Sequence, residues 1–231
     1  MTLMNHIPSG PFRAVLFDLD GTLLDTLQDI AITMNTVLAG EGLPTHSMDE
    51  FRIMVGSGMR DLVTKALPEE TRQAAAIEYH LGKMQERYAD QWNEHSRPYD
   101  GIDRLLDAID RLGLKKAILS NKPDHFTKIC AEELLSRWHF DVVMGHHDGI
   151  VHKPDPSGAL LVSQLLGVQP YSILYVGDSG IDMLTATASG MYPLGVLWGY
   201  RPASELTASG AVQIASSPDD IIDLLHSTAI C

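Results

Sequence analysis

The chain has 231 residues, 45% of them hydrophobic, and this length allows one large domain or a core with a smaller domain. Its formal net charge of −13, with 30 acidic residues against 17 Lys and Arg residues and no basic run, argues against a nucleic-acid partner. No segment approaches the ~20 apolar residues that cross a bilayer and no signal segment is recognisable, so we expect a cytoplasmic protein without a membrane partner.

Short runs of apolar and β-branched residues alternate with helical patterns along the chain. These runs span residues 14–17, 117–119, 142–144, 173–176 and 193–197. Strands that alternate with helices favour a parallel sheet with crossover helices. The sequence therefore predicts an α/β fold with a Rossmann-like parallel sheet.

Residues 26–97 interrupt this alternation. The interval has no convincing strand but carries apolar residues at helical spacing. Proline and glycine in residues 98–101 mark a connection back to the sheet. We therefore expect a core of residues 1–25 and 98–231 with an inserted helical domain of residues 26–97. An insert that enters and leaves beside an active loop can close over it and exclude water.

Two aspartates follow the first predicted strand. Asp18 and Asp20 stand at positions i and i+2, so both carboxylates project from the same face of an extended strand end. Two such carboxylates repel each other unless a cation holds both ionised, which implies a divalent ion. Gly21 allows a sharp turn after the pair, and the Thr22 hydroxyl can hold the loop or contact a bound anion. The alternative interpretation is an Asp-rich surface turn.

Polar residues also follow later strands. Ser120, Asn121 and Lys122 offer a hydroxyl, an amide and an ammonium that suit a phosphate oxygen, although Ser-Asn is also an ordinary helix cap. Lys153, beside a proline and ahead of a helical pattern, can supply a point charge to a phosphoryl group and to a carboxylate nucleophile. The three histidines nearby match no closed zinc site in their spacing, so we interpret them as solvated loop residues.

The last acidic pair follows residues 173–176. Asp178 can join Asp18 on one metal ion, and Asp182, one helical turn further on, can reach the same site through water or a supporting hydrogen bond. Oxygen ligands that retain water favour Mg²⁺. The alternative interpretation is that Asp178 is an ordinary helix N-cap.

Taken together, these segments resemble the haloacid dehalogenase (HAD) superfamily of phosphatases, whose pattern is DxDGT, then Ser or Thr, then Lys, then GDSxxD, each after a core strand. The match holds in order, spacing and context and covers residues 12–228. The helical insert resembles the C1 cap of that family. Segments 17–26, 55–58, 120–123 and 196–200 look most like those of phosphoglycolate phosphatases.

The resemblance implies a phosphatase that forms an aspartyl phosphate with the help of Mg²⁺. Asp18 would be the nucleophile, and Asp20 would protonate the leaving alkoxide and then activate water. The metal would be held by Asp18, the backbone carbonyl of Asp20 and Asp178, with Asp182 in support.

The resemblance also implies a phosphate-binding set. Ser120, Asn121 and Lys153 would bind the transferring phosphoryl oxygens, where the transition state needs positive potential and fixed donors. Gly21 and Thr22, in the turn after the first aspartates, are further candidate phosphate-binding residues.

Substrate choice is expected to depend on the helical insert. In residues 56–60, two glycines permit close backbone approach, and Arg60 could form a bidentate pair with a carboxylate such as that of phosphoglycolate. Arg60 could equally be a solvated helix residue beside Asp61. Phosphoglycolate is therefore the first substrate expected.

Other interpretations of the same residues stay open. Within enzymes, these are a phosphatase for pyrophosphate or a sugar phosphate and a β-phosphoglucomutase-like phosphotransferase, since such mutases also keep Asp20. A non-catalytic phosphate-binding or regulatory protein is less favoured, because pure binding has no use for a second acid at that position. The expected partner is a small phosphorylated metabolite, and both a monomer and a homodimer fit the sequence.

Overall fold

The computed structural model describes residues 11–229, so residues 1–10 and 230–231 of the expected core lie outside the described residues. Its centre is a six-stranded sheet in the order β5-β4-β1-β6-β7-β8, in which all neighbours pair in parallel. The strands are β1 (Ala14–Phe17), β4 (Lys115–Pro123), β5 (Val142–His146), β6 (Ile173–Gly177), β7 (Tyr192–Val196) and β8 (Gln213–Ala215). The predicted α/β fold with a parallel sheet is confirmed.

All five predicted strands are present, and the structure adds β8 and lengthens β4. β8 has only three residues, too few for a hydrophobic pattern to show. β4 extends beyond its apolar centre in both directions, and the polar residues Lys116, Ser120 and Lys122 are buried within it. Ser120 and Lys122, which the sequence places after the strand, therefore belong to the strand itself.

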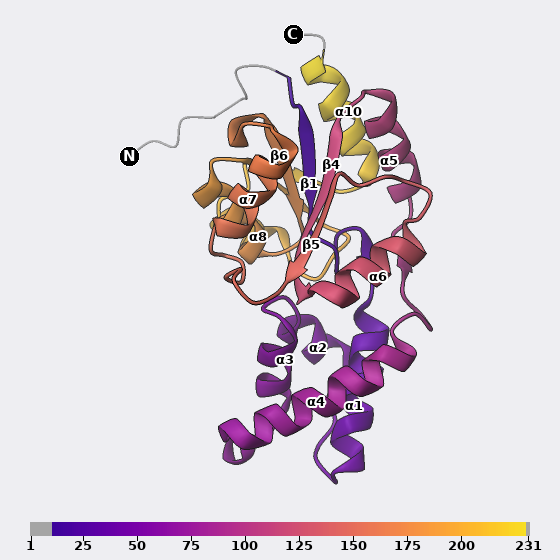
Figure 1. Cartoon of the computed structure of the whole chain (residues 1–231), viewed down its shortest axis with the longest axis vertical. Helices are drawn as coiled ribbons and strands as arrows, with labels where there is room; N and C mark the ends of the chain where they lie inside the picture. The colour runs from indigo at the N-terminus through magenta and orange to yellow at the C-terminus, as the bar shows by residue number, and fades with distance from the viewer. Residues whose placement is uncertain (1–10, 230–231) are drawn as a thin grey trace.

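Helices cover both faces of the sheet (Figure 1). The flanking helices are α5 (Ile102–Arg111), α6 (Asp124–Leu134), α7 (Ser157–Leu166), α8 (Gly180–Ser189), α9 (Ala203–Ala208) and α10 (Pro218–Ala229). Because both faces are covered, β1 is apolar at every position. Val15 and Phe17 pack with the α5 and α10 side chains, and Ala14 and Leu16 pack with those of α7 and α8.

Four further helices lie together beyond the carboxyl ends of the strands (Figure 1). They are α1 (Leu27–Gly40), α2 (Met48–Met54), α3 (Met59–Ala66) and α4 (Ala74–Gln91). We call this group, residues 27–91, the cap. On α1 the buried residues Ile30, Met34 and Leu38 recur at helical spacing, as the sequence pattern predicted. All four helices fall within the predicted helical insert.

The two chain connections to the cap lie side by side. β2 (Leu24–Asp25) and β3 (Arg97–Pro98) form a short antiparallel pair that the sequence analysis did not predict. The buried carboxylate of Asp29 accepts hydrogen bonds from the backbone N–H groups of His95, at 3.0 Å, and Ser96, at 2.7 Å. The entry and the exit of the cap are therefore fixed at one place, where a hinge would lie.

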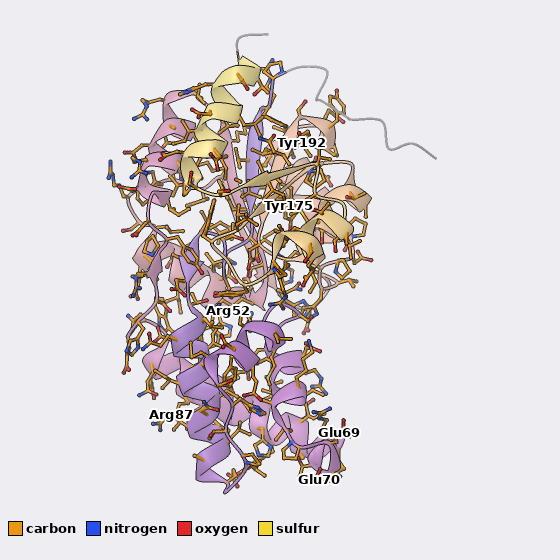
Figure 2. All side chains as sticks on the ribbon, turned by 180° about the vertical axis from the view of Figure 1, so that it is seen from behind. Arg52, Glu69, Glu70, Arg87, Tyr175 and Tyr192 are labelled. Atoms are coloured by element: carbon orange, nitrogen blue, oxygen red, sulfur yellow. The ribbon has the colours of Figure 1, made fainter. Side chains whose placement is uncertain are left out.

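Seen from behind with all side chains drawn, the molecule shows how the cap is oriented (Figure 2). Glu69, Glu70 and Arg87 lie toward the far end of the cap, whereas Arg52 lies near its junction with the sheet. Among the helices that the structure describes, none combines the length and the apolar character needed to cross a membrane.

Candidate active site

The carboxyl ends of the central strands face the cap, and a cavity of about 50 Å³ lies between them. This edge of a parallel α/β sheet is where ligands generally bind. The sheet side of the cavity carries Asp18, Asp20, Ser120, Asn121, Lys122 and Pro123, and the cap side carries Ile30, Val55, Gly56, Gly58, Met59, Leu62, Met84 and Tyr88. The site is thus polar on the sheet side and largely apolar on the cap side.

Three buried aspartates gather at this edge. Oxygen atoms of Asp18, after β1, and of Asp178 and Asp182, after β6, all lie within 4.8 Å of one another. Burial raises the pKa of Asp18 to about 7, with Lys153 opposing the shift and Asp182 adding to it. Burial, Asp182 and Asp18 raise the pKa of Asp178 well above its ordinary value. Carboxylates this close are stable in the ionised state only beside positive charge.

The donor set fits a divalent cation. The Oδ1 atom of Asp18 is buried and accepts no hydrogen bond of ordinary geometry from the described residues, although the Lys153 ammonium lies 2.9 Å away. Asp182 is already engaged: its Oδ2 accepts from the Ser179 hydroxyl at 2.6 Å, and its Oδ1 accepts from Lys153 at 2.7 Å. Asp18 therefore has an oxygen open to direct metal contact, whereas both oxygens of Asp182, like those of Asp178, already accept hydrogen bonds.

Lys153 lies between two of these acids. Its buried ammonium contacts Asp18 and Asp182 and donates to the carbonyl of Leu119 at 3.0 Å. Burial lowers the pKa of Lys153, but Asp18 and Asp182 raise it more, so its pKa lies well above the ordinary value and the amine is charged. A cation is thus fixed beside the carboxylate that the sequence analysis assigned as nucleophile.

Lys122, which the sequence predicts as a donor to a phosphate oxygen, contacts an acid and a tyrosine of the protein in the structure. Its ammonium lies 3.0 and 3.2 Å from the two oxygens of Asp20 and 2.8 Å from the hydroxyl of Tyr88 on α4. Burial lowers the pKa of Lys122, whereas Asp20 and Tyr88 raise it, and the net pKa lies well above its ordinary value. The sequence singled out Lys122 by its place after Ser120 and Asn121 but did not predict its pairing with Asp20 and Tyr88.

The side chain of Asn121 joins two loops. Its amide nitrogen donates to the carbonyls of Gly56 in the cap, at 3.0 Å, and Lys153, at 3.1 Å, and its oxygen accepts from the Lys153 backbone N–H at 2.8 Å. The amide protons are therefore engaged with the protein instead of facing the cavity. The hydroxyl of Ser120 accepts a bond from the Lys122 backbone N–H at 3.3 Å and can still donate to a ligand.

Gly21 and Thr22 build the surroundings of Asp178. Gly21 has φ of +88°, and a Cβ there would lie 2.4 Å from Oδ2 of Asp178, so both the backbone and the space require glycine. The Thr22 hydroxyl donates to Oδ1 of Asp178 at 3.3 Å, and the backbone N–H of Tyr200 donates to Oδ2 at 2.7 Å. The Thr22 hydroxyl thus holds a carboxylate instead of facing the space for an anion.

The structure does not bring Arg60 to the other candidate residues. Its side chain on α3 is half exposed, pairs with Glu78 of α4 and is not part of the described cavity wall. The physical reason is the orientation of α3, which turns Met59 and Leu62 toward the cavity and leaves Arg60 on the solvent side. The expected contact between Arg60 and a substrate carboxylate finds no support here.

The histidines differ from the expected solvated loop. The rings of His146 and His152 are stacked, with centroids 3.4 Å apart, and partial burial lowers the pKa of each. His152 also packs against Gly58 of the cap, since a Cβ on Gly58 would lie 2.7 Å from its Nε2. The ring of His152 thus forms part of the contact between the sheet and the cap, and the ring of His146 stacks on it.

Residues 15–196 match the family described as haloacid dehalogenase-like hydrolase. A phosphoglycolate phosphatase of Xylella fastidiosa (strain 9a5c) is 34% identical over 199 residues, covering 86% of this chain and 86% of that protein. An N-acetylmuramic acid 6-phosphate phosphatase of Pseudomonas aeruginosa is 33% identical over 224 residues, covering 95% and 96%. The crystal structure of a predicted phosphoglycolate phosphatase from Haemophilus somnus 129PT has a TM-score of 0.83 and 25% identity, covering 92% of this chain and 97% of that one.

The fold and the motifs along its strand ends define a hydrolase with an α/β sheet and a helical cap. The chain belongs to the haloacid dehalogenase-like hydrolase family. It is similar over most of its length to phosphoglycolate phosphatases, so the predicted family and the predicted class of enzyme, a phosphoric monoester hydrolase, are confirmed.

Proposed function

We propose that the protein is a Mg²⁺-dependent phosphatase that hydrolyses a small-metabolite phosphomonoester through an aspartyl phosphate. The observation that carries this proposal is the buried group of Asp18, Asp178 and Asp182, with the charged Lys153 between Asp18 and Asp182. Acidic ligands and a fixed cation side by side suit a site that takes both a divalent ion and a phosphoryl group.

Covalent catalysis begins at Asp18. A carboxylate oxygen of Asp18 forms a bond to phosphorus while the bond from phosphorus to the leaving alkoxide breaks. Asp20 gives a proton to that alkoxide, which leaves as an alcohol. Water then attacks the aspartyl phosphate and passes a proton to Asp20, and inorganic phosphate departs from the restored Asp18 carboxylate.

Charge on the transferring phosphoryl group is met by fixed donors. Lys153 and the hydroxyl of Ser120 bind its oxygens. The backbone N–H groups of Gly21 and Thr22 already donate to the carbonyls of Leu24, at 2.8 Å, and Leu19, at 3.3 Å. Mg²⁺, when bound by Asp18, Asp178 and the backbone carbonyl of Asp20, supplies further positive charge next to these oxygens. Asp182 supports the site through its bonds to Lys153 and Ser179.

Phosphoglycolate is the first substrate to test. Relatives that carry this name support it. One relative is instead named for N-acetylmuramic acid 6-phosphate, so that compound belongs among the substrates to test.

The remaining alternatives differ in what accepts the phosphoryl group. A phosphatase for pyrophosphate or a sugar phosphate would release inorganic phosphate from those compounds, whereas a β-phosphoglucomutase-like enzyme would return it to a hexose phosphate. A non-catalytic phosphate-binding protein would bind these ligands without turnover. For all of them we propose that residues 26–97 act as a cap domain over a core of residues 1–25 and 98–231.

Phosphate release from a panel of esters tests the proposal. The panel holds phosphoglycolate, pyrophosphate, glucose phosphates and N-acetylmuramic acid 6-phosphate, each with and without Mg²⁺, and Asp18→Asn is the control variant. We expect Mg²⁺-dependent turnover that is abolished by Asp18→Asn and is fastest with phosphoglycolate. Equal activity on all members of the panel would contradict phosphoglycolate as the substrate but not the phosphatase mechanism. Binding without turnover would contradict both.

A further inference from the structure

Lys122 is a buried charged residue that the proposed mechanism does not use. It lies at the end of β4, it is 6% exposed, and its ammonium contacts Asp20 from one side and Tyr88 of the cap from the other. The ammonium also lies 4.8 Å from the centre of the Tyr88 ring. A lysine buried in this way costs free energy that its contacts must offset.

Its environment differs from that of another buried lysine on the same strand. Lys116, near the start of β4, pairs with Asp110, whose side chain is 51% exposed, away from the cavity. Both partners of Lys122 line the cavity, and Tyr88 is itself fully buried with its ring edge-on to Phe126 at 5.0 Å. Lys122 is therefore part of the wall of the candidate site, whereas Lys116 is not.

Asp20 is held by two donors from different parts of the chain. Its Oδ1 accepts from the Thr26 hydroxyl at 2.7 Å and from Lys122 at 3.0 Å, and its Oδ2 lies 3.2 Å from Lys122. Thr26 immediately precedes α1, at the entry to the cap. The direction of the carboxylate is thus defined by one residue of the sheet and one at the hinge.

We propose that Lys122 is a positioning residue that orients the Asp20 carboxylate toward the leaving-group oxygen. Because Lys122 also contacts Tyr88, this orientation depends on the closed position of the cap. The proposal rests on the phosphatase function proposed above. Withdrawal of α4 would remove the Tyr88 hydroxyl from the Lys122 ammonium and leave the lysine with one partner fewer. Asp20 is then held firmly only when the cap excludes water from the cavity.

A role in orienting Asp20 matters most for substrates whose leaving group needs a proton. An alkyl phosphate releases a strongly basic alkoxide that needs a proton from Asp20, whereas 4-nitrophenyl phosphate releases a weakly basic phenolate that needs none. If Asp20 loses its orientation, hydrolysis of the alkyl phosphate must therefore slow more than hydrolysis of 4-nitrophenyl phosphate. Damage to the fold or to the nucleophile must slow both alike.

The test compares kcat/KM for phosphoglycolate, or for the best alkyl ester of the panel, with kcat/KM for 4-nitrophenyl phosphate. In Lys122→Met we expect the alkyl value to fall roughly 10- to 100-fold more than the aryl value. Lys116→Met is the matched control, because it also removes a buried lysine from β4, and we expect the ratio of the two values to stay unchanged. Thermal unfolding of each variant establishes that it is folded.

Tyr88→Phe is the second variant, because it removes only the hydroxyl and keeps the ring. We expect it to lower the same ratio in the same direction, by roughly 3- to 10-fold, as befits one hydrogen bond. An equal loss on both esters in Lys122→Met and Tyr88→Phe would overturn the positioning role while leaving the phosphatase function intact. Failure of the wild-type protein to hydrolyse any ester would overturn the phosphatase function and this role with it.

Discussion

The guanidinium of Arg201, in the loop after β7, donates a 2.7 Å hydrogen bond to the carbonyl of Val55, the residue that directly follows α2. It also donates to the carbonyls of Ile53, at 2.9 Å, and Arg52, whose side chain marks the junction in Figure 2. The last carbonyls of a helix have no partner within the helix. A residue of the sheet part thus completes a helix of the cap, and the closed arrangement is stabilised at this point.

Replacing Arg201 with methionine is expected to weaken closure. Hydrogen bonds from a charged donor are worth about 1.5–3 kcal/mol each when buried, and partial exposure reduces that, so we expect kcat/KM for the preferred ester to fall roughly 5- to 10-fold. Arg104→Met, which removes an exposed arginine paired with Asp219 in the sheet part, is the matched control. Equal kinetics in the two variants would show that Arg201 does not contribute to closure.

Gly21→Ala is expected to displace Asp178. The new Cβ would need to sit 2.4 Å from Oδ2 of Asp178 at a φ of +88°. We expect a loss of about 2–4 kcal/mol in the free energy of unfolding and a raised requirement for Mg²⁺. Gly42→Ala separates the two causes, because φ of Gly42 is +68° but a Cβ there would meet no atom within 4 Å among the described residues. Denaturant unfolding of both variants measures this, and equal losses would leave strain as the sole cause.

The parts of the site that lie within single motifs were predictable from the sequence. Asp18 and Asp178 each stand directly after a strand that its apolar run reveals, and Lys153 lies in the segment that joins β5 to α7. Parallel strands bring their carboxyl ends to one edge. The partnership of Lys122 with Tyr88 was not predictable, because 34 positions separate them and the packing of α4 on the sheet decides the contact. The inward face of α3 was predictable, because Met59, Leu62, Val63 and Ala66 recur at helical spacing and Arg60 lies off that face.

Arg60→Ala is expected to leave substrate preference unchanged. The side chain pairs with Glu78 on the solvent side of the cap, and exposed pairs of this kind contribute roughly 0–1 kcal/mol. The measurement is the ratio of kcat/KM for phosphoglycolate to kcat/KM for an uncharged phosphate ester of similar size, in the wild type and the variant. A selective loss on phosphoglycolate would mean that Arg60 swings inward to bind its carboxylate.

The apparent affinity for the divalent ion is expected to rise with pH, because the buried acids bind protons at low pH. Burial raises the pKa of Asp18 from 3.8 to about 7 and that of Asp178 well above its ordinary value. Without the metal, the folded protein holds protons on these groups that the unfolded chain has already released, so stability falls as the pH rises from about 4 to about 7. A metal ion must displace those protons, and its apparent affinity therefore rises over the same interval.

Thermal unfolding with and without Mg²⁺ at several pH values measures this linkage. We expect the increase in Tm caused by Mg²⁺ to be larger at pH 8 than at pH 5.5, and the apparent affinity to rise by up to about tenfold per pH unit below pH 7 for each proton displaced. Asp110→Asn, which alters an acid outside the cluster that pairs with Lys116, should keep the pattern. Asp178→Asn should flatten it, because one carboxylate that competes for protons and metal is gone. An increase in Tm that does not vary with pH would mean that the ion does not bind at the carboxylates of Asp18 and Asp178.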